Sequence, residues 1–417
     1  METKWKKNVA LFLSGQAVTL FGSSLVQYAI SWHITLQTQS GAMMTIAVLV
    51  GFLPTFFMSP FGGVLADRYN RKYLINGADA LIALATLALA ILFMLGYQAL
   101  WLLFVCSAIR ALGTGVQTPA VQALIPQIVP AEHLVRVNGI QSTLQSIALL
   151  AAPALSGVLL TVSSLETLFF IDVITAAIGI TIVFFFVQVP APVKTYSGSE
   201  KPLTYVHDLK EGFKYIKKHG YVKRICLLSA CFLFAAAPMA FLTPLQVTRN
   251  FGADIWRLSA VEIVFIIGMS AGGILMSTWG GFKNKIHSMA LSCALTGLCA
   301  ALLGVLSNFI LYLICMGALG AIMALYNAPS MALLQSTVEE AFMGRVFGVF
   351  TMISTIMMPL GMAVFGPLGD IINIDILLIG TGIFIFLLSF MFIISKTMRD
   401  YGAVQKTIPE SEIPETL

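Results

Sequence analysis

Three ionisable side chains lie inside long apolar stretches of the sequence: Asp172, Glu262 and Arg110. An arginine at the centre of a bilayer costs at least about 2.5–3.5 kcal/mol, so a charge at that depth needs a partner or a wet cavity. A carboxylate there takes up a proton when it is dehydrated and ionises when water reaches it. We expect Glu262 and Asp172 to couple to protons and Arg110 to adjust the local charge, with structural hydrogen bonding as the alternative. A further acid, Asp79, lies nearer the start of its stretch, and we expect it at the membrane interface.

Uncharged polar residues follow the helical period on two of the apolar stretches. On the first stretch four of them recur at i, i+3, i+7 and i+11, and on another Thr114 and Gln117 share a face with Arg110. A polar stripe facing lipid is costly, so we expect these faces to meet protein or water. Met and aromatic residues elsewhere can repack around varied apolar ligands, although ordinary core packing is the alternative. The predicted substrate cavity is lined by Gln16, Thr19, Ser23, Gln27, Thr114, Gln117, Met239, Phe241, Met323, Tyr326 and Asn327.

The sequence contains only one match to a catalytic motif, and its context does not fit that motif. The stretch GMSAG from Gly268 to Gly272 matches the GxSxG pattern of a nucleophilic serine. That motif needs a strand, a sharp turn and a histidine partner, whereas this copy lies in an apolar run without a histidine. Glycines four residues apart better fit close helix packing. The sequence also lacks a GxxxxGK phosphate loop. We therefore expect no enzyme, no cofactor and no metal site.

The composition indicates what must hold these residues in place. Of the 417 residues 58% are hydrophobic and only 10% are charged, and the mean hydropathy is +0.90. A soluble domain carries about 25% charged residues, and disorder requires low hydrophobicity. The apolar runs are long and do not alternate, which argues against a membrane β-barrel. The sequence therefore predicts an all-α integral membrane protein.

Twelve apolar runs are long enough to span a bilayer, which takes about 20 residues each. The predicted spans are 9–35, 42–66, 73–96, 100–124, 138–161, 167–189, 223–247, 257–280, 286–306, 309–333, 345–367 and 374–395. The one long connection becomes periodic after a Pro-rich start, with Leu209, Phe213 and Ile216 spaced for one helical face. We expect an amphipathic helix on the membrane surface there.

The chain contains an internal repeat. RVNGI at Arg136 returns as RVFGV at Arg345, and GGVLADR at Gly62 returns as the degenerate GGFKNK at Gly280. Parallel repeats of this kind are typical of transporters whose substrate site lies between two halves. We predict six-helix bundles over residues 1–189 and 223–396, a cytoplasmic linker with an amphipathic helix over 190–222, and a cytoplasmic tail over 397–417.

The distribution of positive charge predicts the orientation. All but three of the 24 Lys and Arg residues fall in the termini or in connections on one side of a twelve-span chain. The exceptions are Arg110, Arg249 and Arg257. The positive-inside rule then places both termini and the central linker in the cytoplasm.

The stretch GVLADRYNRK, which begins at Gly63, resembles the loop signature of the major facilitator superfamily between its second and third helices. Asn70 stands where the family usually has Gly, and Asn tolerates the backbone of a tight turn. The resemblance implies conformational gating by Gly63, Asp67, Arg68 and Arg71. The C-terminal copy lacks the acid, so a charge contact should be stronger in the N-terminal half. The alternative is a loop that carries only topogenic charges.

Across the whole chain the sequence resembles bacterial macrolide-efflux transporters of the drug:proton antiporter group. It rests on stretches such as FIDVITA, RALGTGVQTPAVQALIPQIVP and MGRVFGVFTMISTIMMPLG. The likeness implies proton-driven export of amphipathic small molecules by alternating access from a bacterial inner membrane. Its partners would be the substrate, protons and the bilayer, with no nucleic acid, and the protein would act as a monomer. Export of a siderophore, metallophore or other metabolite stays open as the alternative, and a membrane enzyme or receptor is less favoured.

Overall fold

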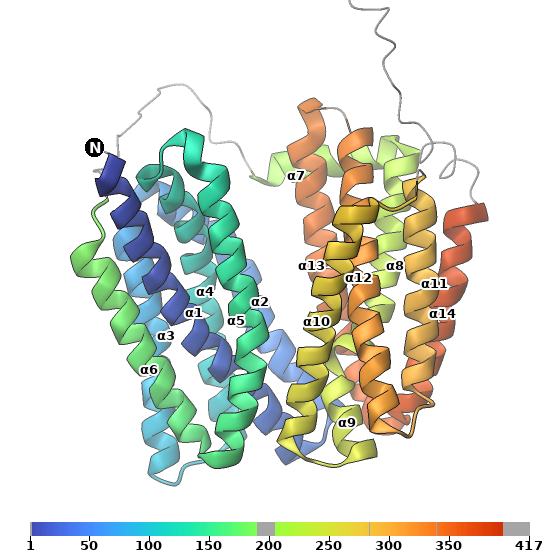
Figure 1. Cartoon of the computed structure of the whole chain (residues 1–417), viewed down its shortest axis with the longest axis horizontal. Helices are drawn as coiled ribbons and strands as arrows, with labels where there is room; N and C mark the ends of the chain where they lie inside the picture. The colour runs from blue at the N-terminus through green and yellow to red at the C-terminus, as the bar shows by residue number, and fades with distance from the viewer. Residues whose placement is uncertain (1, 190–204, 283, 339, 395–417) are drawn as a thin grey trace, which may run out of the picture. The chain divides into compact units, whose positions relative to one another are not determined.

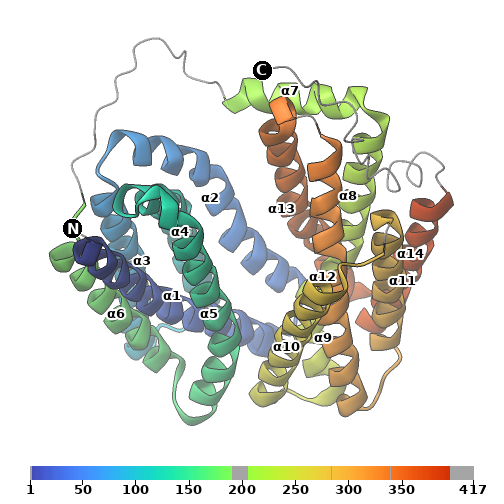
Figure 2. The ribbon, with the colours of Figure 1, turned by 45° about the horizontal axis from the view of Figure 1, so that its top comes forward.

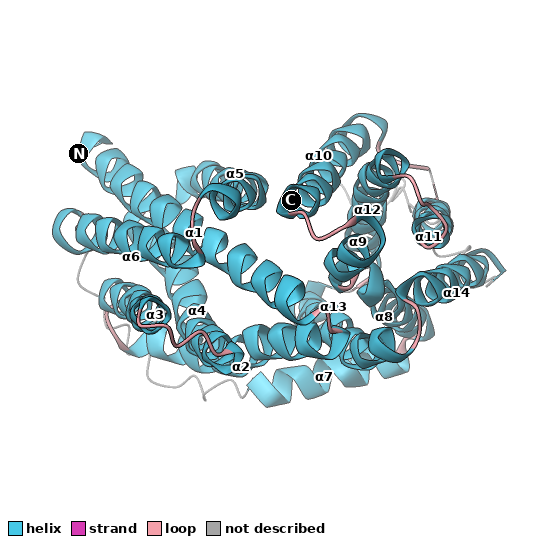
Figure 3. Cartoon of the chain, turned by 90° about the horizontal axis from the view of Figure 1, so that it is seen from below, coloured by secondary structure: helices cyan, strands magenta, loops and turns pink. Residues whose placement is uncertain are grey.

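Backbone hydrogen bonding dictates the secondary structure of so apolar a chain. In hydrocarbon every N–H and C=O must be paired, and a helix pairs them within one segment. The computed structural model describes residues 2–189, 205–282, 284–338 and 340–394, and this part of the chain folds into helices without any strand (Figures 1 and 3). The all-α prediction is therefore confirmed.

The helices follow the predicted spans closely. In the first part of the chain they are α1 (Glu2–Thr38), α2 (Gly41–Arg68), α3 (Arg71–Met94), α4 (Leu100–Ile128), the short η1 (Ala131–His133), α5 (Leu134–Val162), α6 (Leu165–Thr181) and its π-helical continuation η2 (Ile182–Phe186). After the linker come α7 (Tyr205–Lys218), α8 (Gly220–Phe241), α9 (Thr243–Phe251), α10 (Ile255–Trp279), α11 (Lys285–Leu303), α12 (Phe309–Thr337), α13 (Glu340–Ile371) and α14 (Ile374–Ile394). Among the described residues 12 helical stretches are long and apolar enough to cross a membrane, and α8 with α9 forms one of them.

Contacts group the chain into two units. The first comprises residues 1–198, 241–263 and 362–373, and the second comprises residues 199–240, 264–361 and 374–417. The first unit thus contains the whole predicted N-terminal half together with two segments of the later helices. Residues 190–204 of the predicted linker and the predicted tail over 397–417 lie outside the described residues, and the predicted boundary between residues 222 and 223 falls in the first turn of α8.

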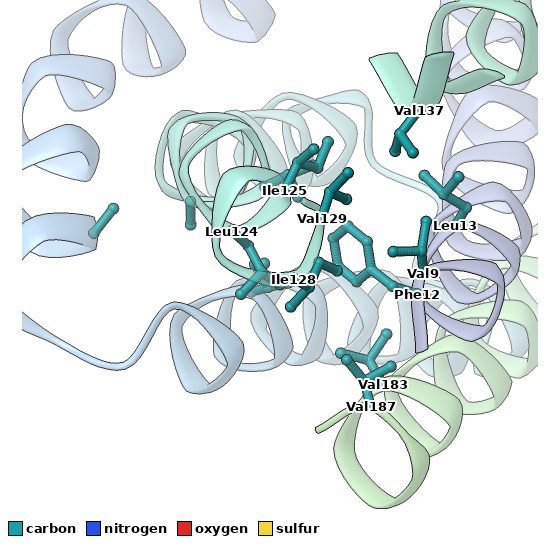
Figure 4. Close-up of a cluster of buried hydrophobic side chains, with 14 residues drawn as sticks. Val9, Phe12, Leu13, Leu124, Ile125, Ile128, Val129, Val137, Val183 and Val187 are labelled. Atoms are coloured by element: carbon teal, nitrogen blue, oxygen red, sulfur yellow. The ribbon is translucent and has the colours of Figure 1, made fainter. Parts of the chain in front are cut away.

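In the first unit, α1 lies against α5 and α6, and α3 against α4 and α6 (Figure 1). Figure 4 shows a cluster of buried apolar side chains to which α1 contributes Phe12, α4 contributes Leu124, α5 contributes Val137 and η2 contributes Val183. Phe12 and Leu124 are completely buried. This packing holds the inward faces of α1 and α4, which carry the polar stripes, in fixed positions.

The helix α7 buries part of the face that the spacing predicts, and the side chain of Leu209 lies outside the described residues. Phe213 is 46% exposed, whereas Ile216 is buried, and Gly212 lies against the backbone of Arg345 on α13. Glu211 pairs with Arg345 at 2.6 Å between Oε2 and Nη1. Figure 2 shows α7 running across the first turns of α13. Within the second unit, α7 is therefore attached to α13 by an ion pair and by close backbone packing.

The GMSAG stretch lies in the middle of α10 and packs against α12. A Cβ added at Gly268 would overlap the carbonyl of Gly317, and one added at Gly272 would overlap the backbone of Ala321. The two glycines therefore permit close helix contact, which confirms the packing interpretation of this motif.

We predict that Gly268→Ala destabilises the protein by about 1–3 kcal/mol, because the added methyl group forces α10 and α12 apart. Thermal unfolding in detergent, followed by circular dichroism, measures the effect. Gly273→Ala is the matched control on the same helix, since a Cβ there meets nothing within 4 Å. Equal unfolding temperatures for the two variants would contradict the prediction.

Candidate functional site

Polar side chains inside the first unit recur at an interval of seven residues on three helices. Gln16 and Ser23 lie on α1, Asp79 and Thr86 on α3, and Arg110 and Gln117 on α4. Seven residues make about two turns, or about 10.5 Å along a helix, and place both side chains of each pair on one face. The six residues therefore form two layers. We call Ser23, Thr86, Arg110 and Asp172 the ion-pair layer, and Gln16, Asp79 and Gln117 the amide layer.

The ion-pair layer centres on a contact between Arg110 on α4 and Asp172 on α6. Arg110 Nη1 donates to Asp172 Oδ2, and the two side chains are 7% and 0% exposed. Thr86 Oγ1 lies 3.1 Å from the same oxygen, and Ser23 Oγ donates to Asp172 Oδ1 at 3.1 Å. The other guanidinium nitrogen, Arg110 Nη2, donates to the Ser23 carbonyl at 3.1 Å. Both charges are thus compensated and hydrogen-bonded, as burial requires.

The amide layer contains a buried acid without a cationic partner. Gln117 Nε2 donates to Asp79 Oδ1 at 2.7 Å, and Asp79 is only 4% exposed. Asp79 therefore packs inside the bundle, because α3 turns this residue toward α1 and α4, and its depth at the membrane interface stays a prediction. Its other oxygen, Oδ2, has no hydrogen-bond partner among the described residues, and neither has the buried Nε2 of Gln16.

A cavity of about 160 Å³ lies beside the amide layer, between α1, α4 and α5. Of the predicted cavity residues, Gln16, Thr114 and Gln117 line it. Its further lining residues are Leu13, Ala17, Leu20, Thr118, Val121, Gln122, Gln141, Leu144 and Gln145. The sequence interpretation missed Gln141 and Gln145, although their spacing of four residues is the signal of one helical face. Amides beside leucines suit a ligand that is partly polar and partly apolar.

The remaining predicted cavity residues of α1 have other surroundings. Thr19 is buried and lies 3.3 Å from the carbonyl of Gly15 through its hydroxyl, and Gly179 of α6 packs against it. Ser23 belongs to the ion-pair layer. Gln27 is exposed and lies near Gly51 of α2.

The predicted cavity residues of the later helices divide between the units. Phe241 belongs to the first unit, whereas Met239, Met323, Tyr326 and Asn327 belong to the second. Within the second unit Tyr326 is buried, donates to Ser229 Oγ at 2.9 Å and stacks on Phe232 with ring centroids 4.3 Å apart. Met239 is also buried, Met323 is half-buried and Asn327 is exposed.

Glu262 on α10 is separate from both layers. Its side chain is half-buried in the first unit, within electrostatic range of the Tyr28 phenol on α1. No hydrogen bond to its carboxylate is found among the described residues. The structure thus brings Arg110 and Asp172 together and leaves Glu262 apart from them.

The predicted gating residues lie at the end of α2. The side chain of Asp67 is 78% exposed and lies 3.7 Å from Arg71, measured between Oδ1 and Nη2. Arg71 also donates to the carbonyls of Ala66 and Ala123, at 2.9 and 2.7 Å, and so ties this turn to α4. Arg68 is exposed, and Gly63 has open space where a Cβ would be.

At the opposite end of α2 the structure reveals a contact that sequence reasoning missed. Asp370 near the end of α13 accepts hydrogen bonds from Ser40 Oγ and Gly41 N, both at 2.7 Å, and from Ala42 N at 3.0 Å. Arg249 of α9 lies 3.3 Å from the same carboxylate. A carboxylate at a helix N-terminus is favoured by the exposed N–H groups and the helix dipole. We call Ser40, Gly41, Arg249 and Asp370 the Asp370 joint.

Among the described residues no group of three or more His, Cys, Asp or Glu is placed to hold a metal ion.

Comparisons with known proteins agree with this arrangement. Residues 12–362 match the profile of the Major Facilitator Superfamily. The chain is 30% identical over 373 residues to Macrolide efflux protein A of Streptococcus pyogenes, covering 89% of this chain and 91% of that protein. It is 24% identical over 366 residues to the enterobactin exporter EntS of Shigella boydii, covering 86% and 84%. The crystal structure of the nucleoside transporter NupG superposes with a TM-score of 0.67 at 16% identity, covering 94% of this chain and 98% of that chain.

We predict that Asp172→Asn lowers the free energy of unfolding by about 3–5 kcal/mol, because it leaves the buried Arg110 without its counter-charge. Chemical or thermal unfolding in detergent measures the loss. Asp254→Asn is the control, since Asp254 is 54% exposed and pairs at 3.3 Å with the half-buried Arg257, and pairs near the surface contribute about 0–1 kcal/mol. An Asp172 variant as stable as this control would show that the ion pair does not support the bundle.

Proposed function

The chain belongs to the major facilitator superfamily, and from this premise we propose that it exports amphipathic small molecules of the macrolide type by proton antiport. It is a multi-pass membrane transporter, and family and fold point to a non-enzyme. The observation that carries the proposed substrate is the 30% identity to Macrolide efflux protein A over 91% of that protein. We further propose that it resides in a bacterial inner membrane, as a monomer with both termini in the cytoplasm.

The chemistry of the cavity supports an amphipathic substrate. Gln16, Gln117, Gln141 and Gln145 present amide donors and acceptors, and leucines of α1 and α5 supply apolar surface. At about 160 Å³ the cavity is smaller than the roughly 300–1,000 Å³ of a typical ligand pocket, so it would take one part of a macrolide, such as an apolar ring segment with its hydroxyls and carbonyls. Uncharged amides attract neither sign of charge, so they fit a ligand that is recognised by hydrogen bonds and shape.

For proton coupling we propose that Glu262 exchanges the proton while Arg110 and Asp172 provide a compensated charge pair. Glu262 is half-buried and lacks a cation within the described contacts, so its protonation leaves no partner stranded. Protonation of Asp172 would instead leave Arg110 as an uncompensated buried charge, which is costly. Among the three predicted coupling residues, Glu262 is therefore the one best suited to change its charge.

Alternating access requires contacts that form in one state and break in another. We propose that the Asp370 joint holds one end of the helices closed and that Gly63, Asp67, Arg68 and Arg71 act at the other end of α2. The joint is suited to this role because its hydrogen bonds join segments 330 residues apart in sequence. Its polar groups can bond to water once they separate, which limits the cost of opening.

Export of a siderophore or metallophore is a second candidate, favoured by the likeness to the enterobactin exporter EntS. Proteoliposomes with an imposed pH gradient discriminate the two, with radiolabelled erythromycin and enterobactin as probes. Uphill accumulation of erythromycin alone supports macrolide export, and accumulation of enterobactin alone supports the alternative. If the gradient drives neither compound, both substrate assignments fail.

We predict that Glu262→Gln abolishes erythromycin accumulation driven by a pH gradient, by at least about tenfold, yet permits downhill equilibration. The neutral amide cannot bind and release the proton, whereas substrate passage does not require that exchange. Flux assays with and without the gradient measure both effects, and Asp254→Asn serves as the surface control. Full gradient-driven export by Glu262→Gln would refute the assignment of this residue.

We predict that a cross-link across the Asp370 joint stops export. In the double variant Ser40→Cys, Asp370→Cys, a short reversible thiol cross-linker should reduce erythromycin flux at least about tenfold, because a closed gate removes one of the two states. Reduction of the cross-link should restore the flux. Each single variant treated in the same way provides the control. Undiminished flux in the cross-linked double variant would show that the joint does not open during transport.

A further inference from the structure

We infer that Asp79 is a second proton-binding site of the transporter and that Gln117 couples its charge to the occupant of the cavity. The inference rests on the proposed proton antiport and extends it to a residue and a helix outside the predicted coupling set. It assigns to the amide layer a role distinct from that of the ion-pair layer.

The first argument compares the two buried acids of the unit. Asp172 has donors on both oxygens and a guanidinium in contact, so its charge is fully compensated. Asp79 is buried to a similar extent, but among the described residues only Gln117 donates to it, at Oδ1, and the nearby Gln16 amide makes no hydrogen bond to Oδ2. An ionised carboxylate without a counter-charge is strongly disfavoured in a low-dielectric interior, whereas the neutral acid is tolerated.

The second argument concerns the charged groups that face Asp79. The packed neighbours of α3 are chiefly α4 and α6, and their charged side chains nearest Asp79 are Arg110 and Asp172. These two neutralise each other in the ion-pair layer, two turns away along the helices. The residual effect of Asp172 on Asp79 is that of a like charge, and the amide of Gln16 lies close enough to interact with the Asp79 carboxylate. On α3 itself the nearest cations, Arg71 and Lys72, lie about two turns away and donate to backbone carbonyls. Among the described residues, therefore, no cation pairs with Asp79.

The third argument is that the side chains around Asp79 can hydrogen-bond to both its protonated and its ionised form. Near the amide layer, three buried side chains have polar atoms that find no partner in the described part of the chain. These atoms are Asp79 Oδ2, Gln16 Nε2 and both amide atoms of Asn76, which lies one turn earlier on α3. When a proton from water forms an O–H bond at Oδ2, Gln16 can turn its amide and accept from that hydroxyl through Oε1. On release the proton returns to water and the carboxylate is restored.

Gln117 connects this change to the cavity, because it both donates to Asp79 and lines the cavity wall. A hydrogen bond to a carboxylate is roughly twice as strong as one to a neutral group, so the ionised acid holds the Gln117 amide firmly. Its Oε1 and second N–H are then oriented for a ligand. Protonation loosens this bond and lets the amide rotate, which weakens the ligand site. Proton and substrate thus oppose each other, as antiport requires.

Proton release on substrate binding tests the inference directly. Because the linkage is reciprocal, erythromycin binding to the detergent-solubilised wild-type protein should release protons into weakly buffered solution, and affinity should increase with pH. Asp79→Asn should bind erythromycin about tenfold more weakly than the wild type at high pH, with little pH dependence and reduced proton release. Asp254→Asn is the surface control and should behave as wild type.

The outcomes separate this inference from the proposed function. If the wild-type protein transports erythromycin with the pH gradient and Asp79→Asn releases protons as the wild type does, the inference fails and proton antiport stands. If a pH gradient drives no transport by the wild-type protein, the proposed function fails whatever Asp79 does.

Carbodiimide labelling of the wild-type protein needs neither a variant nor a substrate. Dicyclohexylcarbodiimide reacts with protonated carboxyls in apolar surroundings, and peptide mass spectrometry locates the adduct. We expect labelling at Asp79 that decreases as pH increases, and none at the paired Asp172. Labelling of Glu262 with Asp79 unmodified at every pH would overturn the inference.

Discussion

A guanidinium buried in hydrocarbon requires a counter-charge, and the first unit is built around the way in which Arg110 obtains one. Asp172 supplies the charge from α6, Thr86 of α3 meets both partners, and Ser23 of α1 contributes its hydroxyl and its carbonyl. Four helices therefore share one polar contact at one height. Since the price of breaking a buried pair is several kcal/mol, this contact fixes the axial register of the helices against one another.

Once that register is set, the position of the amide layer follows. Gln16, Asp79 and Gln117 lie two turns from their counterparts on the same three helices, so they must meet at a second common height. The acids of the two layers differ in whether a cation lies beside them. One contains a neutralised pair that strengthens the bundle, and the other contains a single acid beside a cavity. The fold thus places the compensated pair and the single acid about 10 Å apart along the same helices.

Three features could be predicted from the sequence: the helical spans, the loop signature and the need of Arg110 for a partner. The first two depend on local composition, and the third depends on the cost of an isolated charge. The burial of Asp79 could not be predicted, because distance from the start of an apolar run does not reveal which neighbour a helix face meets. Asp370 was missed for a related reason: its partners at Ser40 and Arg249 are remote in sequence. Phe213 shows the limit of periodicity, which identifies a face of α7 but not which of its residues are buried.

Next to the Asp370 joint, the backbones of α2 and α13 are in direct contact. Gly41 and Gly366 approach so closely that a Cβ on either would overlap the other helix, and the hydroxyl of Thr45 bonds across to the carbonyl of Met362 at 3.0 Å. Two helix surfaces that meet at glycines can separate without a change of side-chain rotamer, so little steric rearrangement opposes their separation. What they require on separation is water for the newly exposed peptide groups. The proposed opening at this point would therefore be a hydration event, and its equilibrium should respond to osmotic pressure, with excluded solutes such as sucrose favouring the closed form.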